Sequence, residues 1–265
     1  MKHSNKHSIL RTENLAIGYS SRKEQTVIAS ELNIELKRGK FVCILGKNGI
    51  GKSTLLRTLS KVQPEIAGNV LIRDKNLSSF SESELSKIMS LVLTEKLPES
   101  NLTVFELIAL GRQPYTNWVG TLTKNDIDKI HKAMQLTKVE HLSQKKYYEL
   151  SDGQLQRVLI SRALAQETEL IILDEPTAHL DVLHKMESFE LLKELASKLH
   201  KTIIISTHEI HLALQTADEL WLMTDDDFIS GTPNELIENK SIEKLFSSDT
   251  VHFDINQQQF FLNKK

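Results

Sequence analysis

A glycine-rich segment between an apolar run and a helical pattern constrains this chain more than any other feature. It reads Gly46-Lys47-Asn48-Gly49-Ile50-Gly51-Lys52-Ser53 and follows a continuous β-prone run at residues 41–45. Such a run predicts a buried strand, and residues 53–61 after the glycines have a helical pattern. A strand, a glycine-rich turn and a helix form a phosphate loop, in which backbone N–H groups and the positive end of the helix surround phosphate oxygens. The chain is therefore predicted to bind a nucleotide.

The residues of this loop have distinct chemical roles. Lys52 is expected to bring a mobile positive charge to the phosphates, and the hydroxyl of Ser53 can bind Mg²⁺. The full set of expected nucleotide contacts in this segment is Gly46, Asn48, Gly49, Gly51, Lys52, Ser53 and Thr54.

The composition excludes several classes of protein. A chain of 265 residues with 40% hydrophobic and 26% charged residues suits one large globular domain or a domain with an inserted lobe. A formal net charge of -2 gives no basic field for nucleic acid, and one cysteine excludes an internal disulfide. The apolar runs are far shorter than the roughly 20 residues that a membrane span needs, and no signal peptide is visible. We therefore expect a cytoplasmic protein.

Strands and helices alternate along much of the chain, which predicts an α/β fold with a mixed, mostly parallel sheet. Alternating patterns at residues 27–36 and 69–73 indicate antiparallel strands beside the phosphate loop. A helical pattern from about residue 82 to residue 166 indicates a lobe inserted into the core. After the lobe we expect a strand at 170–173, a helix at 182–199, a strand at 202–206, a helix from 209, a strand at 220–223 and a terminal hairpin within 251–262.

These patterns predict one domain over residues 1–265 with three parts. A phosphate-loop (RecA-like) core with an antiparallel β subdomain is expected at 10–95 and 167–246. The helical lobe is expected at 96–166, and a tail follows at 247–265.

An acidic pair, Asp174-Glu175, ends the apolar strand at 170–173. Asp174 is expected at the carboxyl edge of the sheet, beside the phosphate loop. A second acidic group at this place holds Mg²⁺ in phosphate-loop enzymes. An acidic pair after a strand is also a common surface turn, and only its combination with residues 46–53 favours the metal site.

The segment Leu150-Ser151-Asp152-Gly153-Gln154-Leu155-Gln156-Arg157 begins a predicted helix at 152–166. Ser151 can cap this helix, and the backbone donors after it form an anion site. A plain helix cap is the alternative interpretation. The two are compatible, because the cap creates the anion site.

The order of these three motifs resembles that of the ATP-binding cassette ATPases, whose signature sequence is a close variant of Leu150-Ser151-Asp152-Gly153-Gln154. The resemblance extends from about residue 10 to about residue 245, and Asp152 replaces the more usual glycine. It implies Mg-ATP as substrate, hydrolysis to ADP and phosphate, and two copies that close head to tail around two ATP molecules. Ser151, Gly153 and Gln154 would then contact the ATP of the other copy.

The resemblance also implies roles for residues outside the loop. Glu175 would polarise the attacking water, and His208 would contact the γ-phosphate, with Lys52 completing the catalytic set. Asp181 would couple the two sites across the dimer, and Tyr19 would stack on adenine. His208 could instead be incidental, and Tyr19 could be a core residue at a strand end.

Glu95 departs from the family pattern. The family has a glutamine where the core meets the helical lobe, after a short strand that we expect at residues 91–94. A carboxylate can still bind Mg²⁺, but an ionised one cannot donate a hydrogen bond. A solvated loop charge is the alternative interpretation of Glu95.

A narrower resemblance concerns the cargo. Residues 103–107, 111–115 and 176–181 look like those of bacterial importers of ferric siderophores, haem or cobalamin. This implies a separate transmembrane permease, an indirect partner in a substrate-binding protein, and a peripheral location on the cytoplasmic face of the inner (cell) membrane. No nucleic-acid partner is expected.

Two other classes of function compete with this interpretation. A soluble cassette ATPase acting on ribosomes or DNA usually has two cassettes or long coiled coils, and this chain shows neither. A plain phosphate-loop NTPase or kinase would leave residues 150–157 unexplained and would need a phosphoacceptor or guanine-recognition motif.

Overall fold

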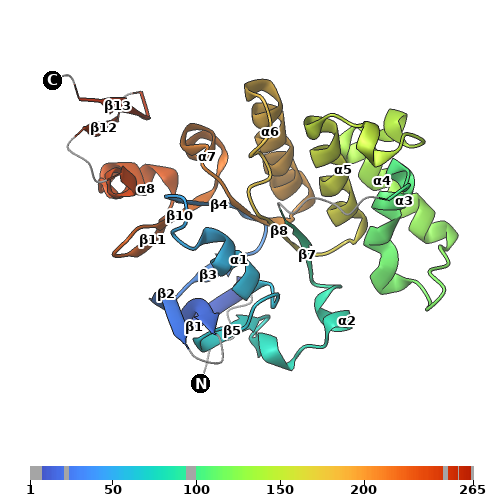
Figure 1. Ribbon diagram of the computed structural model, residues 1–265, viewed down its shortest axis with the longest axis horizontal. Helices are drawn as coiled ribbons and strands as arrows, with labels where there is room; N and C mark the ends of the chain where they lie inside the picture. The colour runs from blue at the N-terminus through green and yellow to red at the C-terminus, as the bar shows by residue number, and fades with distance from the viewer. Residues whose placement is uncertain (1–7, 21–23, 94–99, 247–249, 256, 264–265) are drawn as a thin grey trace.

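A six-stranded sheet crosses the centre of the molecule, with helices on both sides of it (Figure 1). The structure, a computed structural model, describes residues 8–20, 24–93, 100–246, 250–255 and 257–263. The strand order is β11-β10-β4-β9-β8-β7, and every neighbouring pair is parallel except β10–β11. The mostly parallel α/β fold is thus confirmed. The strands are β4 Phe41–Gly46, β7 Met89–Val92, β8 Leu170–Leu173, β9 Thr202–Ser206, β10 Glu219–Met223 and β11 Phe228–Gly231.

A second, antiparallel sheet lies below the first in Figure 1 and packs with helix α1. Its order is β2-β1-β5-β6, and β3 pairs with β1. The strands are β1 Ser8–Ser20, β2 Gln25–Leu32, β3 Glu35–Lys37, β5 Ala67–Ile72 and β6 Lys75–Asn76. The helices of the molecule are α1 Lys52–Leu59, α2 Glu82–Leu85, α3 Val104–Ala109, α4 Lys124–Thr137, α5 Asp152–Ala165, α6 Val182–Leu199, α7 Ile210–Thr216 and α8 Pro233–Glu238.

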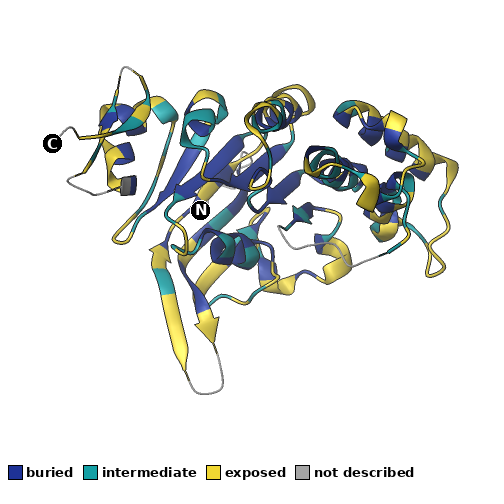
Figure 2. Ribbon diagram, turned by 45° about the horizontal axis from the view of Figure 1, so that its top comes forward, coloured by how far each residue is buried: buried dark blue, intermediate teal, exposed yellow. Residues whose placement is uncertain are grey.

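The central strands are buried on both faces, as Figure 2 shows. Alternate residues of β4 divide between two hydrophobic cores, because successive side chains of a strand point to opposite faces. Phe41, Cys43 and Leu45 pack in the core that contains α6 and α7. Val42 and Ile44 pack in the core that contains α1 and the antiparallel sheet. The continuous apolar run in the sequence follows from this two-sided burial.

Helices α3, α4 and α5 form a group beside the central sheet, on the right in Figure 1. Each begins with a capping box, in which a Ser or Thr hydroxyl accepts from the backbone three residues on and an acidic or amide side chain accepts in return. The three caps are Thr103, Thr123 and Ser151. This group corresponds to the expected lobe, whose boundary residues stay a prediction. Within the described ranges, no helix combines the length and apolar composition needed to cross a membrane.

Three elements differ from the sequence-based expectation. The strand expected at 91–94 lies at Met89–Val92, where Gln166 and Glu169 hold its beginning, and Thr94 falls outside the described residues. The pattern at 27–36 is divided between β2 and β3. Strand β11 was not predicted, because the polar run Asp225-Asp226-Asp227 before it indicates a polar tail. That run is a turn, closed by hydrogen bonds between Thr224 and Asp227, and β12 Val251–Asp254 with β13 Gln259–Leu262 form the expected terminal hairpin.

Candidate functional site

The glycine-rich loop joins β4 to α1 with two glycines in the left-handed region. Gly49 has φ of 78° and Gly51 has φ of 110°. A Cβ on Gly51 would also lie 2.5 Å from Cγ2 of Ile28, so glycine is required there on two counts. Gly51 occupies the N-cap of α1, where it offers no side chain to the first N–H groups of the helix. Those donors and the positive helix end are therefore open to an anion.

Lys52 is 4% exposed and folds back over this loop. Its ammonium donates to the carbonyls of Gly46 and Lys47, at 3.0 Å in both cases. Burial lowers the pKa of Lys52, while the nearby carboxylates of Glu175 and Asp174 act in the opposite direction. A partly desolvated cation held at a phosphate-binding loop interacts strongly with an added anion, because less water screens it.

Asp174 collects hydrogen bonds from the ends of neighbouring elements. Ser53, on the first turn of α1, donates its hydroxyl to Oδ1 of Asp174 at 2.9 Å. Ser206, the last residue of β9, donates its hydroxyl to the same oxygen at 2.6 Å. The parallel register of β4, β9 and β8 brings these three residues to one edge of the sheet. A hydroxyl and a carboxylate oxygen side by side are oxygen donors of the kind that Mg²⁺ takes.

Glu175 has an unusual backbone conformation for a glutamate, with φ of 47°. Its N–H donates to Oγ of Ser206 at 2.8 Å, and its Oε1 lies 2.9 Å from Nε2 of His208. The structure therefore places Glu175 and His208 in contact, and these are the two residues that the sequence assigned to catalysis in addition to Lys52. A left-handed conformation in a non-glycine residue costs free energy and is found disproportionately at functional sites.

Tyr19 lies at the end of β1 and reaches the phosphate-loop helix. Its hydroxyl lies 2.9 Å from Oγ1 of Thr54, while its side chain is 57% exposed. An anchored hydroxyl with an exposed ring leaves the aromatic face available for stacking on a base. The alternative of a core tyrosine at a strand end is not what the structure shows.

The signature residues lie at the start of α5. In Figure 1 the strands β8 and β7 lie between this helix and α1. Ser151 and Gln154 bond to each other in the cap of that helix, at 3.3 Å and 3.2 Å. Gly153 packs against α6, where an added Cβ would lie 2.8 Å from the ring of His184. Asp181 caps α6 and accepts from both the N–H and the ring of His184. Ser151, Gly153 and Asp181 thus form one group that is separate from the phosphate loop.

One predicted site residue and one unpredicted residue complete the description. Glu95 lies outside the described residues. Ser206 was predicted only as a strand end, although it holds both Asp174 and Glu175. A small hydroxyl at the carboxyl end of a parallel strand is the signal that could have identified it.

Comparison with known proteins gives consistent relatives. The family described as ABC transporter matches residues 29–178. An uncharacterized ABC transporter ATP-binding protein of Methanocaldococcus jannaschii is 37% identical over 92% of this chain and 83% of its own length. A probable siderophore transport system ATP-binding protein of Bacillus subtilis is 35% identical, covering 91% and 86%. The ferric enterobactin transport ATP-binding protein of Escherichia coli is 34% identical, covering 89% and 86%.

Solved structures have the same fold. A protein of Clostridium perfringens that is part of the ABC transporter complex cbiONQ is 30% identical with a TM-score of 0.77, covering 89% of this chain and 93% of its own. A dimeric structure of a bacterial ABC transporter cassette is 25% identical with a TM-score of 0.74, covering 85% and 99%.

Replacing the unpredicted serine tests whether it organises the site. In Ser206→Ala, Asp174 loses a donor and the N–H of Glu175 loses its acceptor. We expect the free energy of unfolding to fall by about 1–3 kcal/mol, the cost of an unmade buried hydrogen bond. We expect nucleotide turnover to fall about ten- to a hundredfold, because misplacing a reacting group is costly. Urea titration and a phosphate-release assay measure the two quantities. Ser197→Ala, which removes a hydroxyl bonded only within α6, serves as the control, and normal turnover by folded Ser206→Ala would contradict the assignment.

Proposed function

We propose that this chain, which belongs to the ABC transporter family and is one of its ATPases, powers the import of a ferric siderophore through a separate permease. The observation that carries the proposal is the agreement between the site and the relatives. The phosphate loop, Asp174 and Glu175 meet at one sheet edge, and relatives covering most of the chain are named for siderophore or ferric enterobactin transport. Haem and cobalamin are the other cargoes that the sequence resemblance leaves open.

The residues around the phosphate loop divide the work on ATP. The loop N–H groups and Lys52 bind the phosphates, and Tyr19 stacks on the adenine. Ser53 and Asp174 would hold Mg²⁺, which would supply positive charge against the negative charge of the phosphates. Glu175 orients and polarises the water that attacks the γ-phosphate. The Nε2 of His208 lies 2.9 Å from Oε1 of Glu175 and holds that carboxylate in place, and His208 is proposed to contact the γ-phosphate of bound ATP.

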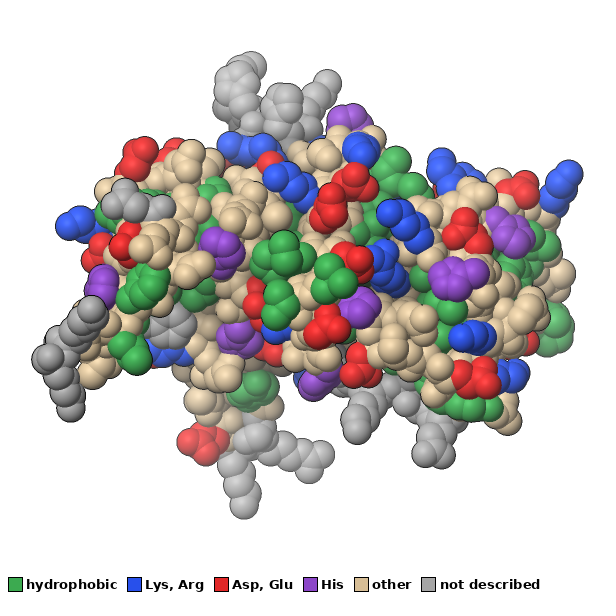
Figure 3. All heavy atoms as spheres, turned by 90° about the horizontal axis from the view of Figure 1, so that it is seen from above, with side chains coloured by type: hydrophobic (Ala, Val, Ile, Leu, Met, Phe, Trp, Pro, Cys, Tyr) green, Lys and Arg blue, Asp and Glu red, His purple; other side chains and the backbone are tan. Residues whose placement is uncertain are grey.

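The site becomes complete only with a second copy of the chain. Ser151, Gly153 and Gln154 lie at the start of α5, away from the chain's own phosphate loop, and we assign them to the nucleotide of a partner. Ser151 and Gln154 already exchange hydrogen bonds in the capping box, so the N–H groups of the first turn that would serve this nucleotide are those of Asp152 and Gly153. The surface beside them favours this contact. Val182, Leu183 and Met186 on α6 are 73%, 63% and 52% exposed, next to Asp181. Figure 3 looks down on this side and shows hydrophobic side chains gathered over α6 among charged and histidine side chains.

Coupling to transport follows from the same arrangement. Closure of two cassettes around two ATP molecules moves the permease from the cytoplasmic face of the membrane, and hydrolysis resets it. Glu95, between the core and the lobe, is proposed to link the nucleotide to the permease and to contribute to the Mg²⁺ site. A substrate-binding protein acts on the other side and never contacts this chain.

The cargo is tested with the complete transporter. The chain is purified with a partner permease from the same organism, and ATP hydrolysis is measured with that permease's binding protein loaded in turn with ferric siderophores, haem or cobalamin. A ferric siderophore is expected to stimulate hydrolysis, and Lys52→Ala should abolish the stimulated rate. Stimulation by haem or cobalamin alone would contradict the cargo and retain the transporter. Failure of the chain to join any permease would contradict the transport function.

The shared site is tested by trapping ATP. In Glu175→Gln the phosphate loop is unchanged, but water is no longer polarised, so hydrolysis should fall about a hundredfold or more. The uncleaved ATP should then hold two chains together. Size-exclusion chromatography with Mg-ATP is expected to show a dimer, and Glu175→Gln with Lys52→Ala should stay monomeric. A monomer that demonstrably contains bound ATP would argue against the shared site.

A further inference from the structure

Arg112 is the largest buried charged side chain among the described residues, and it has no part in the proposed binding and hydrolysis of ATP. It lies on a short 3-10 helix, Leu110–Tyr115, that follows α3, and only 2% of it is exposed. The adjacent Gly111 allows this segment to lie directly against α5, because a Cβ there would lie 2.3 Å from the carbonyl of Arg162. A buried charge is retained only where it is paired and hydrogen-bonded, so its partners indicate what it does.

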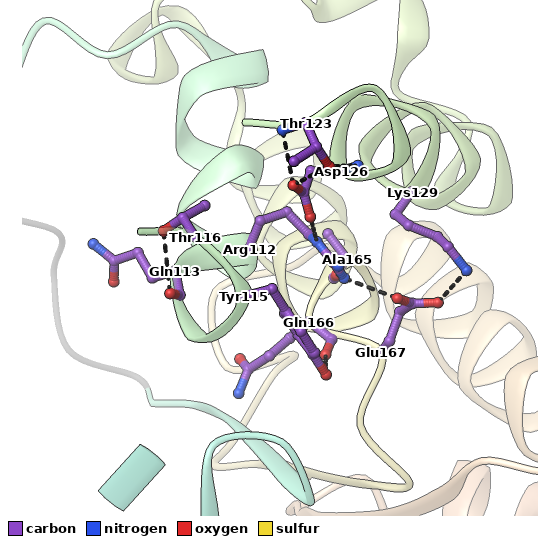
Figure 4. A network of polar contacts seen from close by, with 10 residues as sticks. All are labelled: Arg112, Gln113, Tyr115, Thr116, Thr123, Asp126, Lys129, Ala165, Gln166 and Glu167. Atoms are coloured by element: carbon purple, nitrogen blue, oxygen red, sulfur yellow. Dashed lines mark hydrogen bonds and ion pairs between the residues drawn. The ribbon is translucent and has the colours of Figure 1, made fainter. Parts of the chain in front are cut away.

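The partners of Arg112 come from three parts of the chain (Figure 4). Its Nε donates to Asp126 on α4 at 3.0 Å. Its Nη1 donates to the carbonyl of Ala165 at 2.6 Å and to the carboxylate of Glu167 at 3.0 Å. The ring of Tyr115 lies 4.1 Å from the guanidinium carbon. One planar cation therefore joins the short helix after α3 to α4 and to the end of α5.

The contact with Asp126 fixes the start of α4. Its second carboxylate oxygen accepts from the N–H and the hydroxyl of Thr123, at 2.9 Å and 2.6 Å, in the capping box of that helix. The hydrogen bonds from Thr123 lower the pKa of Asp126, so the carboxylate is ionised opposite Arg112. The cation and the helix cap thus depend on one another.

The contacts with Ala165 and Glu167 fix the end of α5. Ala165 is the last residue of that helix, where carbonyls lack helical partners and a cation is favourable. Glu167 turns the chain with φ of 57°, in the left-handed region, and Lys129 also contacts its carboxylate. The contact with Arg112 contributes most to holding this unfavourable conformation, because Arg112 is buried whereas Lys129 is partly exposed and screened by water.

The chain directly after α5 is anchored to the core instead. The side-chain amide of Gln166 donates to the carbonyls of Ser86 and Met89, at 2.6 Å and 3.1 Å, beside β7. Glu169 forms ion pairs with Arg38 and Arg73. Arg112 therefore lies at the junction where the chain leaves the end of α5 and continues to strand β8.

Because α5 is long, a small change of angle at this junction would displace the signature residues at its other end. Helix α5 has 14 residues and is about 21 Å long, with Ser151 at its far end. A tilt of about 10° at the junction would move Ser151 by roughly 4 Å, which is more than the reach of a hydrogen bond.

We propose that Arg112 is a positioning residue, which sets the angle of α5 to the core and so places Ser151 against the nucleotide of the partner chain. The inference rests on the proposed shared site. It requires that loss of Arg112 weaken the ATP-bound dimer while binding of Mg-ATP to the same chain's phosphate loop is unaffected.

The test uses the full chain with Glu175→Gln, so that ATP is trapped. Arg112→Met is combined with Asp126→Asn, because asparagine can still accept from Thr123 while the buried pair of charges is removed together. We expect the Kd for Mg-ATP to be unchanged and the dimer dissociation constant to rise about tenfold or more, by sedimentation. Lys129→Gln removes only the outer contact of Glu167 and should dimerise normally. Arg112→Lys, which keeps the charge without the planar fork, should give a smaller loss.

A distance measurement separates positioning from a general loss of stability. Spin labels at Tyr148→Cys, just before α5, and Val62→Cys, just after α1, report the orientation of α5, since both positions are exposed and the one native cysteine, Cys43, is buried. We expect a broader distance distribution in Arg112→Met with Asp126→Asn, and in Arg112→Lys if the double variant does not fold.

The outcomes are distinct. Normal dimerisation and an unchanged distance distribution in the folded Arg112 variants would overturn the positioning role. A lower melting temperature alone, with both of those readouts normal, would also overturn it. If Glu175→Gln with Arg112 intact does not dimerise, the shared site itself is wrong.

Discussion

The parallel register of β4, β9 and β8 is the constraint on which the rest of the site depends. It places the carboxyl ends of these three strands at one edge of the sheet. There the carboxylate of Asp174 accepts hydrogen bonds from the hydroxyls of Ser53 and Ser206. Hydrogen bonds to a charged group contribute about 1.5–3 kcal/mol each, so this carboxylate also stabilises the strand ends. Each strand can supply its functional residue only because alternate side chains fill two hydrophobic cores, which fixes the register.

The second half of the proposed site is built on a different principle. Ser151 and Gly153 are not connected to the sheet edge by strand register, but by the length of α5 and the junction at its end. Gly153 packs on His184 of α6, and Arg112 ties the other end to Glu167. In the proposed arrangement a rigid sheet edge binds ATP, whereas α5, held by Gly153 at one end and by the Arg112 junction at the other, presents the signature to a partner. Motion between these two parts is what a transport ATPase has to transmit.

Much of the fold and of the phosphate site could be predicted from the sequence, because short local patterns encode it. The run at 41–45, the glycines after it and Asp174 each follow from strand and turn chemistry. Long-range contacts have no such local pattern. Ser206 is one hydroxyl at a strand end, and its partners lie 31 and 32 residues away in the sequence. The sequence places Arg112 only within a cargo-related motif, residues 111–115. Neither its burial nor its three hydrogen-bond partners can be inferred from neighbouring residues.

The central claim is that hydrolysis needs residues from two chains. Its most direct test needs no mutation: the rate of ATP hydrolysis per chain is measured for the unmodified protein over a wide range of protein concentrations, at saturating Mg-ATP. If the site is shared, the rate per chain is low when the protein is dilute and rises with concentration until dimers predominate. A rate per chain that stays constant down to concentrations at which sedimentation shows only monomers would contradict the claim.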